Sequence, residues 1–421
     1  MAIKDFDRKL DQFAELIVKV GINVQPGQKL VVNGKNFTRG VNLEAAPLMR
    51  RVAHHAYKTG ARLVDIIWDD PELTLERLKH APKDSFEEFP TWRTRAMEEY
   101  LGAGNALLTI YSDDPDRYKG FDTDTINVLQ RTMETNLAPA MEHLMMNRFN
   151  WSLVALPVPG WAQKLYPKDS PEGAVDKLWE KIFELCRLDR DDPVKAWDEH
   201  IANLQTRSSH LTEKNYSALK YTGPGTDLKI GLPEGHIWES ARIKSTAGVP
   251  YVANLPTEEV FSMPHKDRVD GTVAATMPLS RAGTIIEDFT ITFKDGRAVD
   301  FQAKKGEEVL KGLLETDEGS RRLGEVALVP DSSPIAQSRM MFYNTLFDEN
   351  AASHIALGRA YRSTMKGGEG MTSEQFSSAG GNDSLVHEDF MIGSNKLDID
   401  GITKNGKAEP VMRQGEWAFS V

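Results

Sequence analysis

Four short apolar runs, separated by helical stretches, recur through the first 190 residues, and this alternation limits the possible folds more than any other feature of the sequence. The runs are Lys29–Val32, Arg62–Trp68, Ala106–Tyr111 and Ser152–Leu156. Ahead of them, Phe6–Val20 repeats apolar residues at the three- and four-residue spacing of an amphipathic helix. Strands that alternate with helices are typical of βαβ units and a mostly parallel sheet. The sequence therefore predicts an open α/β domain over residues 1–190, in which Arg62–Trp68 is a buried strand.

The pattern changes after about residue 190, where one long helix over Pro193–Leu211 is followed mainly by strand signals. Turn residues between short apolar runs predict two hairpins, Ala218–Ile230 and Thr290–Phe301. Gly367–Asn382 is rich in glycine and serine and is expected to be a loop. Two strand-like pieces around a turn follow it, Phe390–Ile392 and Leu397–Ile399. We predict a β-rich α+β C-terminal domain over residues 191–421.

The composition excludes several classes of protein. The 421 residues carry a formal net charge of −11 and contain no run of basic residues, which argues against a nucleic-acid partner. No stretch of about 18 apolar residues is present, and the first 28 residues lack the apolar core of a secretory signal, so we expect a cytoplasmic protein that does not cross a membrane. The single cysteine, Cys186, rules out an intrachain disulfide and a cysteine-rich zinc site. The N-terminal domain also lacks the glycine-rich motifs of nucleotide-binding loops.

The strongest local pattern that could carry chemistry is His387-Glu388-Asp389. In a strand, residues two apart share a face, so His387 and Asp389 would point the same way and Glu388 would point away. An imidazole and a carboxylate on one face suit a divalent metal such as zinc. The alternative is an ordinary strand with a His/Asp pair at its surface.

Three further segments of the C-terminal half place titratable groups in or beside apolar runs. Only one of the neighbours Glu258 and Glu259 can enter a site from an extended segment, and both could instead be solvated. Glu325 opens an apolar strand, where a carboxylate is costly to bury without a partner or a cation. His354 lies inside another apolar run, as a ligand or as a hydrogen-bonded core histidine. Together with His387 and Asp389 these residues offer more ligands than one catalytic zinc needs, and they suit two metal ions that share a carboxylate.

At these segments the sequence resembles the thermophilic-type metalloaminopeptidases, the family of aminopeptidase T and its relatives. The matching pieces occur in the order of that family and spread over nearly the whole chain. They are residues 21–27, 221–228, 254–261, 324–329, 350–358 with Tyr361, and 387–394.

The resemblance implies a two-metal exopeptidase that acts on peptides with a free N-terminus and forms a homodimer of two-domain chains. Its implied metal ligands, all in the C-terminal domain, are Glu259, Glu325, His354, His387 and Asp389. Tyr361 is implied as a weak ligand or as a donor to the reacting carbonyl. A general acid must protonate the leaving amine, and Glu258 is a candidate if the local strand is bulged. His265 and Glu388 have equal support for that role.

The residues leave two other functions open. A two-metal phosphoesterase would use the same kinds of ligand, and Arg359 and Arg362, which flank Tyr361, could bind its phosphate. A non-catalytic small-molecule binding protein would use the same side chains as polar lining. Oxygen and nitrogen ligands also admit zinc, cobalt or manganese. The sequence does not choose among these metals or indicate the preferred N-terminal residue.

Overall fold

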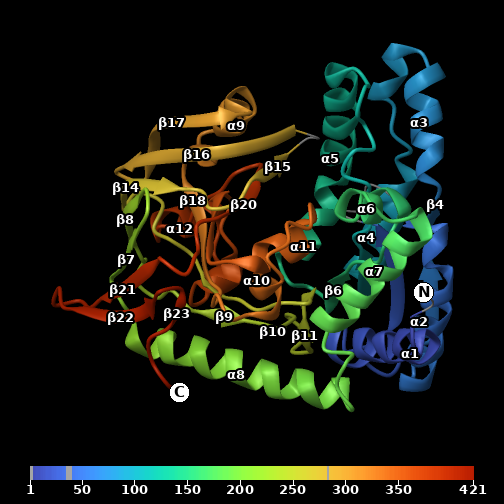
Figure 1. Cartoon of the computed structure of the whole chain (residues 1–421), viewed down its shortest axis with the longest axis horizontal. Helices are drawn as coiled ribbons and strands as arrows, with labels where there is room; N and C mark the ends of the chain where they lie inside the picture. The colour runs from blue at the N-terminus through green and yellow to red at the C-terminus, as the bar shows by residue number, and fades with distance from the viewer. Residues whose placement is uncertain (1–2, 35–39, 282–283) are drawn as a thin grey trace. The chain divides into compact units, whose positions relative to one another are not determined.

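The computed structural model describes residues 3–34, 40–281 and 284–421, which form two compact units (Figure 1). The first unit contains the chain up to Glu199 together with Arg242–Pro256. The second unit contains His200–Ala241 and Thr257–Val421. The sequence prediction has two continuous ranges, 1–190 and 191–421, whereas here a segment from the second half of the chain belongs to the first unit.

The first unit is built on a five-stranded sheet whose neighbouring strands are all parallel, as the sequence predicts. Its order is β12-β6-β5-β1-β3. The strands are β1 (Lys29–Gly34), β3 (Leu63–Ile66), β5 (Ala106–Ile110), β6 (Trp151–Val154) and β12 (Asn254–Leu255). Segment 242–256 supplies β12 and, just before it, a small hairpin of β10 (Arg242–Lys244) and β11 (Pro250–Val252). A short parallel pair, β2 (Val41–Asn42) and β4 (Trp68–Asp69), completes the strands of this unit.

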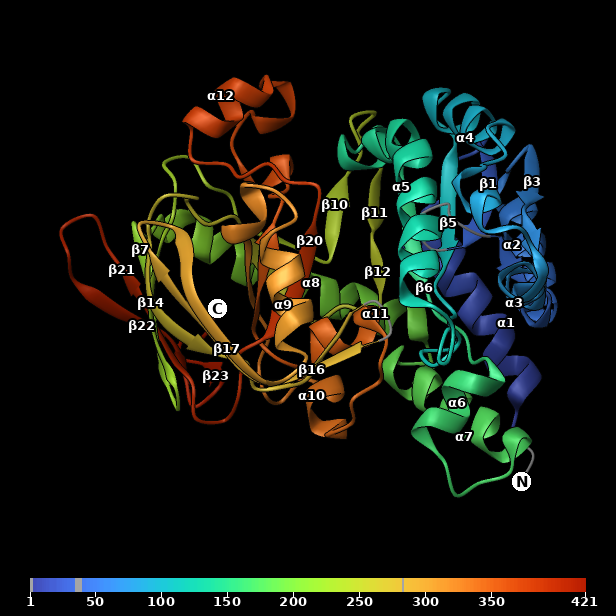
Figure 2. The same ribbon diagram turned by 90° about the horizontal axis from the view of Figure 1, so that it is seen from above.

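Helices surround this sheet (Figure 2). Apolar residues of α4 and α5 pack against β1 and β5 around Val31, Met97, Leu107 and Leu137. The helices are α1 (Phe6–Leu16, continued as a π-helix over Ile17–Gly21), α2 (Ala46–Thr59), α3 (Pro71–His80), α4 (Trp92–Gly102), α5 (Thr123–Met145), α6 (Pro159–Leu165) and α7 (Pro171–Leu185). No helix in the described ranges has both the length and the apolar character needed to cross a lipid bilayer.

The prediction of a buried strand at Arg62–Trp68 is wrong. The segment divides into β3 and β4, and the side chains of Leu63 and Trp68 are 38% and 40% exposed. The reason is the place of β3 at the edge of the sheet, where β1 is its one partner among the described strands. An apolar run alone does not distinguish a central strand from an edge strand.

The second unit contains a nine-stranded sheet in which all neighbours are antiparallel. The division between the units falls within α8 (Pro193–Lys214). Both predicted hairpins are confirmed, as β7 with β8 and β16 with β17. The strands are β7 (Ala218–Gly223), β8 (Thr226–Gly231), β14 (Val269–Ala274), β15 (Leu279–Arg281), β16 (Thr284–Lys294), β17 (Arg297–Lys305), β21 (Asp398–Ile402), β22 (Ala408–Arg413) and β23 (Glu416–Trp417).

The second sheet of this unit has five antiparallel strands in the order β20-β19-β18-β13-β9. One face carries Phe390, which contacts Phe289 of β16 with ring centroids 5.4 Å apart. The opposite face carries Glu325, His354 and Asp389 and is the polar face of the sheet. The strands are β9 (Glu239–Ser240), β13 (Val260–Ser262), β18 (Leu323–Leu328), β19 (His354–Gly358) and β20 (His387–Met391).

One local prediction for the second unit needs correction. Gly367–Asn382 is not only a loop, because Ser373–Ser378 forms helix α12 with a capping box between Thr372 and Gln375. The predicted strand-like pieces Phe390–Ile392 and Leu397–Ile399 overlap β20 and β21, and these two strands belong to different sheets. The remaining helices are α9 (Glu307–Leu314), α10 (Pro334–Ser338) and α11 (Thr345–Asp348).

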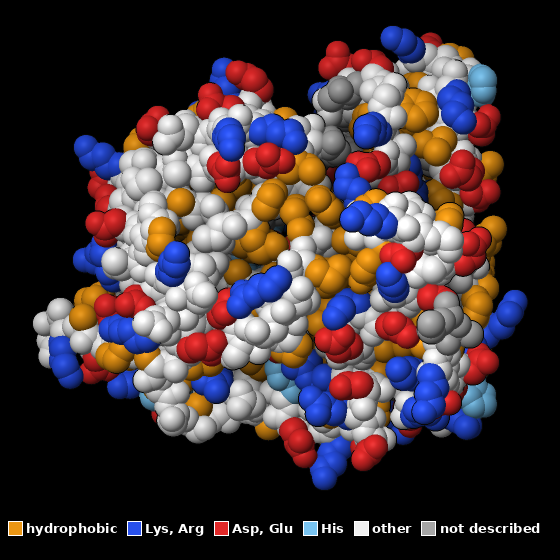
Figure 3. Space-filling model, viewed as in Figure 1, with side chains coloured by type: hydrophobic (Ala, Val, Ile, Leu, Met, Phe, Trp, Pro, Cys, Tyr) orange, Lys and Arg blue, Asp and Glu red, His pale blue; other side chains and the backbone are white. Residues whose placement is uncertain are grey.

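On the face shown in Figure 3, acidic and basic side chains are intermixed.

Candidate metal centre

The polar face of the five-stranded sheet gathers the candidate ligands from four segments. Directly opposed residues of antiparallel strands share a face, and the shared face recurs every second residue. The register pairs Ala356 with both Glu325 and Asp389, and it pairs His354 with Ala327. His387, opposite Gly358, falls on this face as well. The predicted alternation within His387-Glu388-Asp389 is therefore confirmed.

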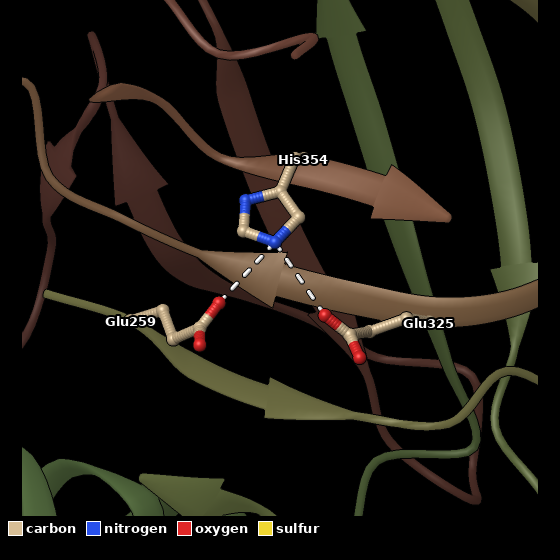
Figure 4. Close-up of side chains that lie close together, drawn as sticks. All are labelled: Glu259, Glu325 and His354. Atoms are coloured by element: carbon tan, nitrogen blue, oxygen red, sulfur yellow. Dashed lines mark ion pairs between the residues drawn. The ribbon is translucent and has the colours of Figure 1, made fainter. Parts of the chain in front are cut away.

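The first group consists of His354, Glu259 and Glu325 (Figure 4). His354 Nε2 lies 3.2 Å from Glu259 Oε2 and 3.4 Å from Glu325 Oε1, and all three side chains are buried. The other ring nitrogen, Nδ1, lies 3.1 Å from the carbonyl oxygen of Ala352. A proton on Nδ1 that is donated to this carbonyl leaves Nε2 free to act as a ligand.

The second group repeats this arrangement with His387, Asp389 and the same Glu325. His387 Nε2 lies 3.5 Å from Asp389 Oδ1 and 3.7 Å from Glu325 Oε2. Its Nδ1 lies 2.7 Å from the carbonyl oxygen of Arg359. Asp389 Oδ1 is buried and accepts no hydrogen bond within the described part of the chain.

The carboxylates of the site raise the pKa values of both histidines, His354 and His387. Burial would lower the pKa of His354, but the carboxylates of Glu259 and Glu325 raise it well above the ordinary value. Burial likewise opposes protonation of His387, yet Asp389 and Glu325 raise its pKa to about 10. Burial raises the pKa of Glu325. These shifts indicate a site whose three carboxylates need positive charge close by.

The donor set fits divalent cations. Within each group the potential ligand atoms lie within 4.8 Å of one another, and Glu325 belongs to both groups. The set combines imidazole nitrogens with carboxylate oxygens, which suits zinc, cobalt or manganese. Asp389 Oδ1 lies 3.5 Å from His387 Nε2 without a hydrogen bond of normal geometry, and it is the kind of buried acceptor that a cation would satisfy.

Tyr361 lies beside the second group, beyond the end of β19. The centroid of its ring lies 5.0 Å from the ring centroid of His387 and 6.1 Å from the ring centroid of Phe261. Burial and the nearby carboxylates, Glu325 foremost, raise the pKa of Tyr361 well above its ordinary value. Its hydroxyl group therefore keeps its proton at neutral pH and can donate a hydrogen bond.

Glu258 and Glu259 face different partners. The Glu258 carboxylate lies 3.5 Å from His200 Nε2 on α8, while its backbone N–H donates to Asn350 Oδ1 at 2.7 Å. Residues 257–259 precede β13 without regular strand structure. The role of Glu258 as a proton donor stays a prediction.

The other two candidates for the general acid lie elsewhere. Glu388 is on the opposite face of β20 and pairs with Arg281. His265 Nδ1 accepts the backbone N–H of Asp267, and neither metal-ligand group includes His265.

Two acidic residues near the site were not anticipated from the sequence. Burial, with Glu259 as the foremost charged neighbour, raises the pKa of Glu349 well above its ordinary value. Glu239 on β9 is opposite Phe261 and therefore shares the polar face. Neither residue belongs to an apolar run or a spaced motif, and only the pairing of distant strands brings Glu239 to this face.

Arg359 and Arg362, which could bind the phosphate of a phosphoesterase substrate, have other partners in the structure. The Arg359 side chain lies 3.4 Å from Asp383 Oδ1. Arg362 donates to the carbonyl oxygen of Met371 at 2.9 Å and to Ser373 Oγ at 3.1 Å. Both guanidinium groups therefore stabilise the segments that follow β19.

Residues 6–417 match the family model for thermophilic metalloproteases. The chain belongs to this family. It is 49% identical to aminopeptidase 2 of Geobacillus stearothermophilus and 46% identical to aminopeptidase AmpS of Bacillus subtilis, with at least 98% of each chain aligned. The solved structure of wild-type AmpT from Thermus thermophilus superimposes with a TM-score of 0.90 at 41% identity, covering 98% of this chain and 100% of that one. The resemblance stated from the sequence is confirmed, and with it the assignment to a family of metallopeptidases.

Proposed function

We propose that the chain is an aminopeptidase that removes the N-terminal residue from peptides with a free amino group, using two divalent cations. The observation that carries the proposal is the pair of carboxylate–histidine groups that share Glu325. Its relatives with 49% and 46% identity are named aminopeptidases.

Five side chains would hold the cations: Glu259 and His354 on one side, His387 and Asp389 on the other, and Glu325 between them. Bound divalent cations supply an activated water and polarise the scissile carbonyl. The bonds from His354 Nδ1 to Ala352 and from His387 Nδ1 to Arg359 fix both rings so that Nε2 faces the carboxylates.

The remaining steps use groups of the protein. Tyr361 donates a hydrogen bond to the oxyanion that forms when water attacks the carbonyl. Glu258 is the predicted donor of a proton to the leaving amine. His200 Nε2 bonds the carbonyl oxygen of Thr257 at 2.9 Å and so anchors the segment that carries Glu258. Glu349 is a second acid close to the ligands. The turnover numbers of Glu258→Gln and Glu349→Gln should therefore be compared, because the variant that lacks the proton donor should lose more activity.

The other functions left open by the sequence have less support. A phosphoesterase needs basic groups near the cations, whereas Arg359 and Arg362 are engaged elsewhere. A binding protein without metal has no use for three buried carboxylates around two histidines. The proposal also includes a cytoplasmic homodimer, which rests on the family resemblance and the composition. Light scattering on the purified protein tests the dimer.

The proposed function is tested with leucyl peptides and their N-acetylated counterparts. Purified protein should release leucine only from the unblocked peptides. A chelator should abolish the activity, and added zinc, cobalt or manganese should restore it. Equal cleavage of the acetylated peptides, or full activity in the chelator, would contradict the proposal.

A further inference from the structure

Glu239 lies on the polar face of the five-stranded sheet but takes no part in the proposed chemistry. Strand β9 is the outer strand, and its Glu239 pairs with Phe261 of β13. Phe261 in turn pairs with Ala327 of β18. The three residues therefore share the face that carries Glu325 and His354, with Glu239 at its margin.

Hydrogen bonds join β9 to the segment that carries Tyr361. Ser363 Oγ donates to Glu239 Oε2 at 2.8 Å. The backbone N–H of Ile237 donates to the carbonyl oxygen of Thr364 at 2.7 Å, and Ser262 Oγ donates to the carbonyl oxygen of Ile237 at 2.8 Å. The carboxylate of Glu239 is thus held in a fixed position relative to Phe261 and Tyr361.

The charges around Glu239 favour a cation. In the described chain, the carboxylate accepts a hydrogen bond from Ser363 Oγ, and its foremost charged neighbours, Glu369 and Glu325, are both acidic. Burial, together with the charges of Glu369 and Glu325, raises its pKa to about 7. A carboxylate in such surroundings is stabilised when a positively charged group comes beside it.

The spacing identifies which part of a substrate could reach Glu239. Neighbouring strands lie about 4.8 Å apart, so the backbones of β9 and β18 are separated by roughly 10 Å, and side chains that stand upright on the same face start from positions this far apart. The α-amino group of a substrate lies too close to its scissile carbonyl to span this distance. A lysine side chain extends roughly 6 Å from Cα to Nζ over five bonds of about 1.5 Å, and arginine reaches further. The rings of Phe261 and Tyr361, which contact each other with centroids 6.1 Å apart, then offer one apolar surface to the methylene groups of the side chain.

We propose that Glu239 is a specificity-determining residue, which binds the positively charged side chain of an N-terminal lysine or arginine. The inference rests on the proposed aminopeptidase function. Phe261 and Tyr361 form the wall of this side-chain pocket, and Ser363 orients the carboxylate at its end.

The test compares lysyl-alanine with norleucyl-alanine, whose first side chain is similar in length but carries no charge. The measured quantity is the ratio of kcat/KM for the two peptides. Because a hydrogen bond to a charged group contributes about 1.5–3 kcal/mol, Glu239→Gln should lower this ratio roughly 10- to 100-fold. Ser363→Ala should lower the ratio less. Glu369→Gln, which removes a nearby exposed charge, should change it by no more than about twofold.

The inference would be overturned if the ratio of kcat/KM were the same in the wild type and in Glu239→Gln. This includes the case in which the variant loses the same fraction of activity on both peptides. A wild type that cleaves neither peptide would contradict the proposed function instead. In that case, calorimetry of the metal-loaded protein with lysinamide and norleucinamide decides. Tighter binding of lysinamide that is lost in Glu239→Gln would support the role of Glu239, and equal binding of the two amides would refute it.

Discussion

Replacing Glu325 with glutamine should remove both bound cations and the activity that depends on them. Glu325 is the only residue of the two candidate groups in the described chain that belongs to both. Its two oxygens lie 3.4 Å from His354 Nε2 and 3.7 Å from His387 Nε2, so the carboxylate reaches toward both histidines. Glutamine keeps the size of the side chain and deletes the charge.

The magnitude follows from Coulomb's law at these distances. Even at about 3.5 Å, well beyond the roughly 2.0–2.2 Å of a zinc–carboxylate bond, a divalent cation gains about 2 kcal/mol from the carboxylate at the dielectric constant of bulk water. Two cations together lose at least about 4 kcal/mol, which lowers their joint binding constant about a thousandfold. The partly dehydrated site makes this value a lower bound.

The assay measures metal content after dialysis, hydrolysis of a leucyl peptide, and the circular dichroism spectrum. Glu325→Gln should keep the wild-type spectrum and lose both metal and activity. Glu388→Gln is the matched control, because Glu388 lies on the opposite face of β20 and should keep both. Full metal content and turnover in Glu325→Gln would refute the argument.

Three other changes have defined outcomes. His387→Ala should lower the bound metal towards one ion per chain together with the rate, and unchanged stoichiometry in elemental analysis would remove His387 from the ligand set. Tyr361→Phe should lower kcat about 10²- to 10³-fold while metal content is unchanged, because one oxyanion donor contributes about 2.7–4 kcal/mol. The pKa of Glu239 is about 7 in the folded protein, compared with 4.5 for an ordinary glutamate. The wild type therefore loses stability as the pH rises from 4.5 through 7, by at most about 3 kcal/mol, because the buried carboxyl group ionises. Glu239→Gln lacks this loss and should become more stable relative to the wild type over the same range. Melting temperatures of both proteins at pH 5 and pH 8.5 measure this difference, and a constant difference would contradict it.

Local patterns predict the features that depend on neighbouring residues. Alternating apolar runs predict the parallel sheet of the first unit, because such strands are buried on both faces. The two-residue period of a strand places His387 and Asp389 together on one face. The metal-ligand roles themselves depend on the family resemblance and remain proposals.

Features that depend on distant pairing could not be predicted in this way. In the described chain, β12 pairs with β6 at Asn254 and Leu255, and neither residue type marks this pairing in the sequence. The exposure of Leu63 follows from the edge position of β3, which depends on the order of strands in the sheet. Glu239 reaches the polar face only because β9 pairs with β13. In each case the deciding contact lies far away in the sequence.

The central claim is that two cations share Glu325, and anomalous diffraction from crystals of the cobalt- or zinc-loaded protein tests it most directly. The account predicts two peaks in each chain. One should contact Glu259 and His354, the other His387 and Asp389, and both should contact Glu325. A single peak, or peaks away from these side chains, would contradict the account.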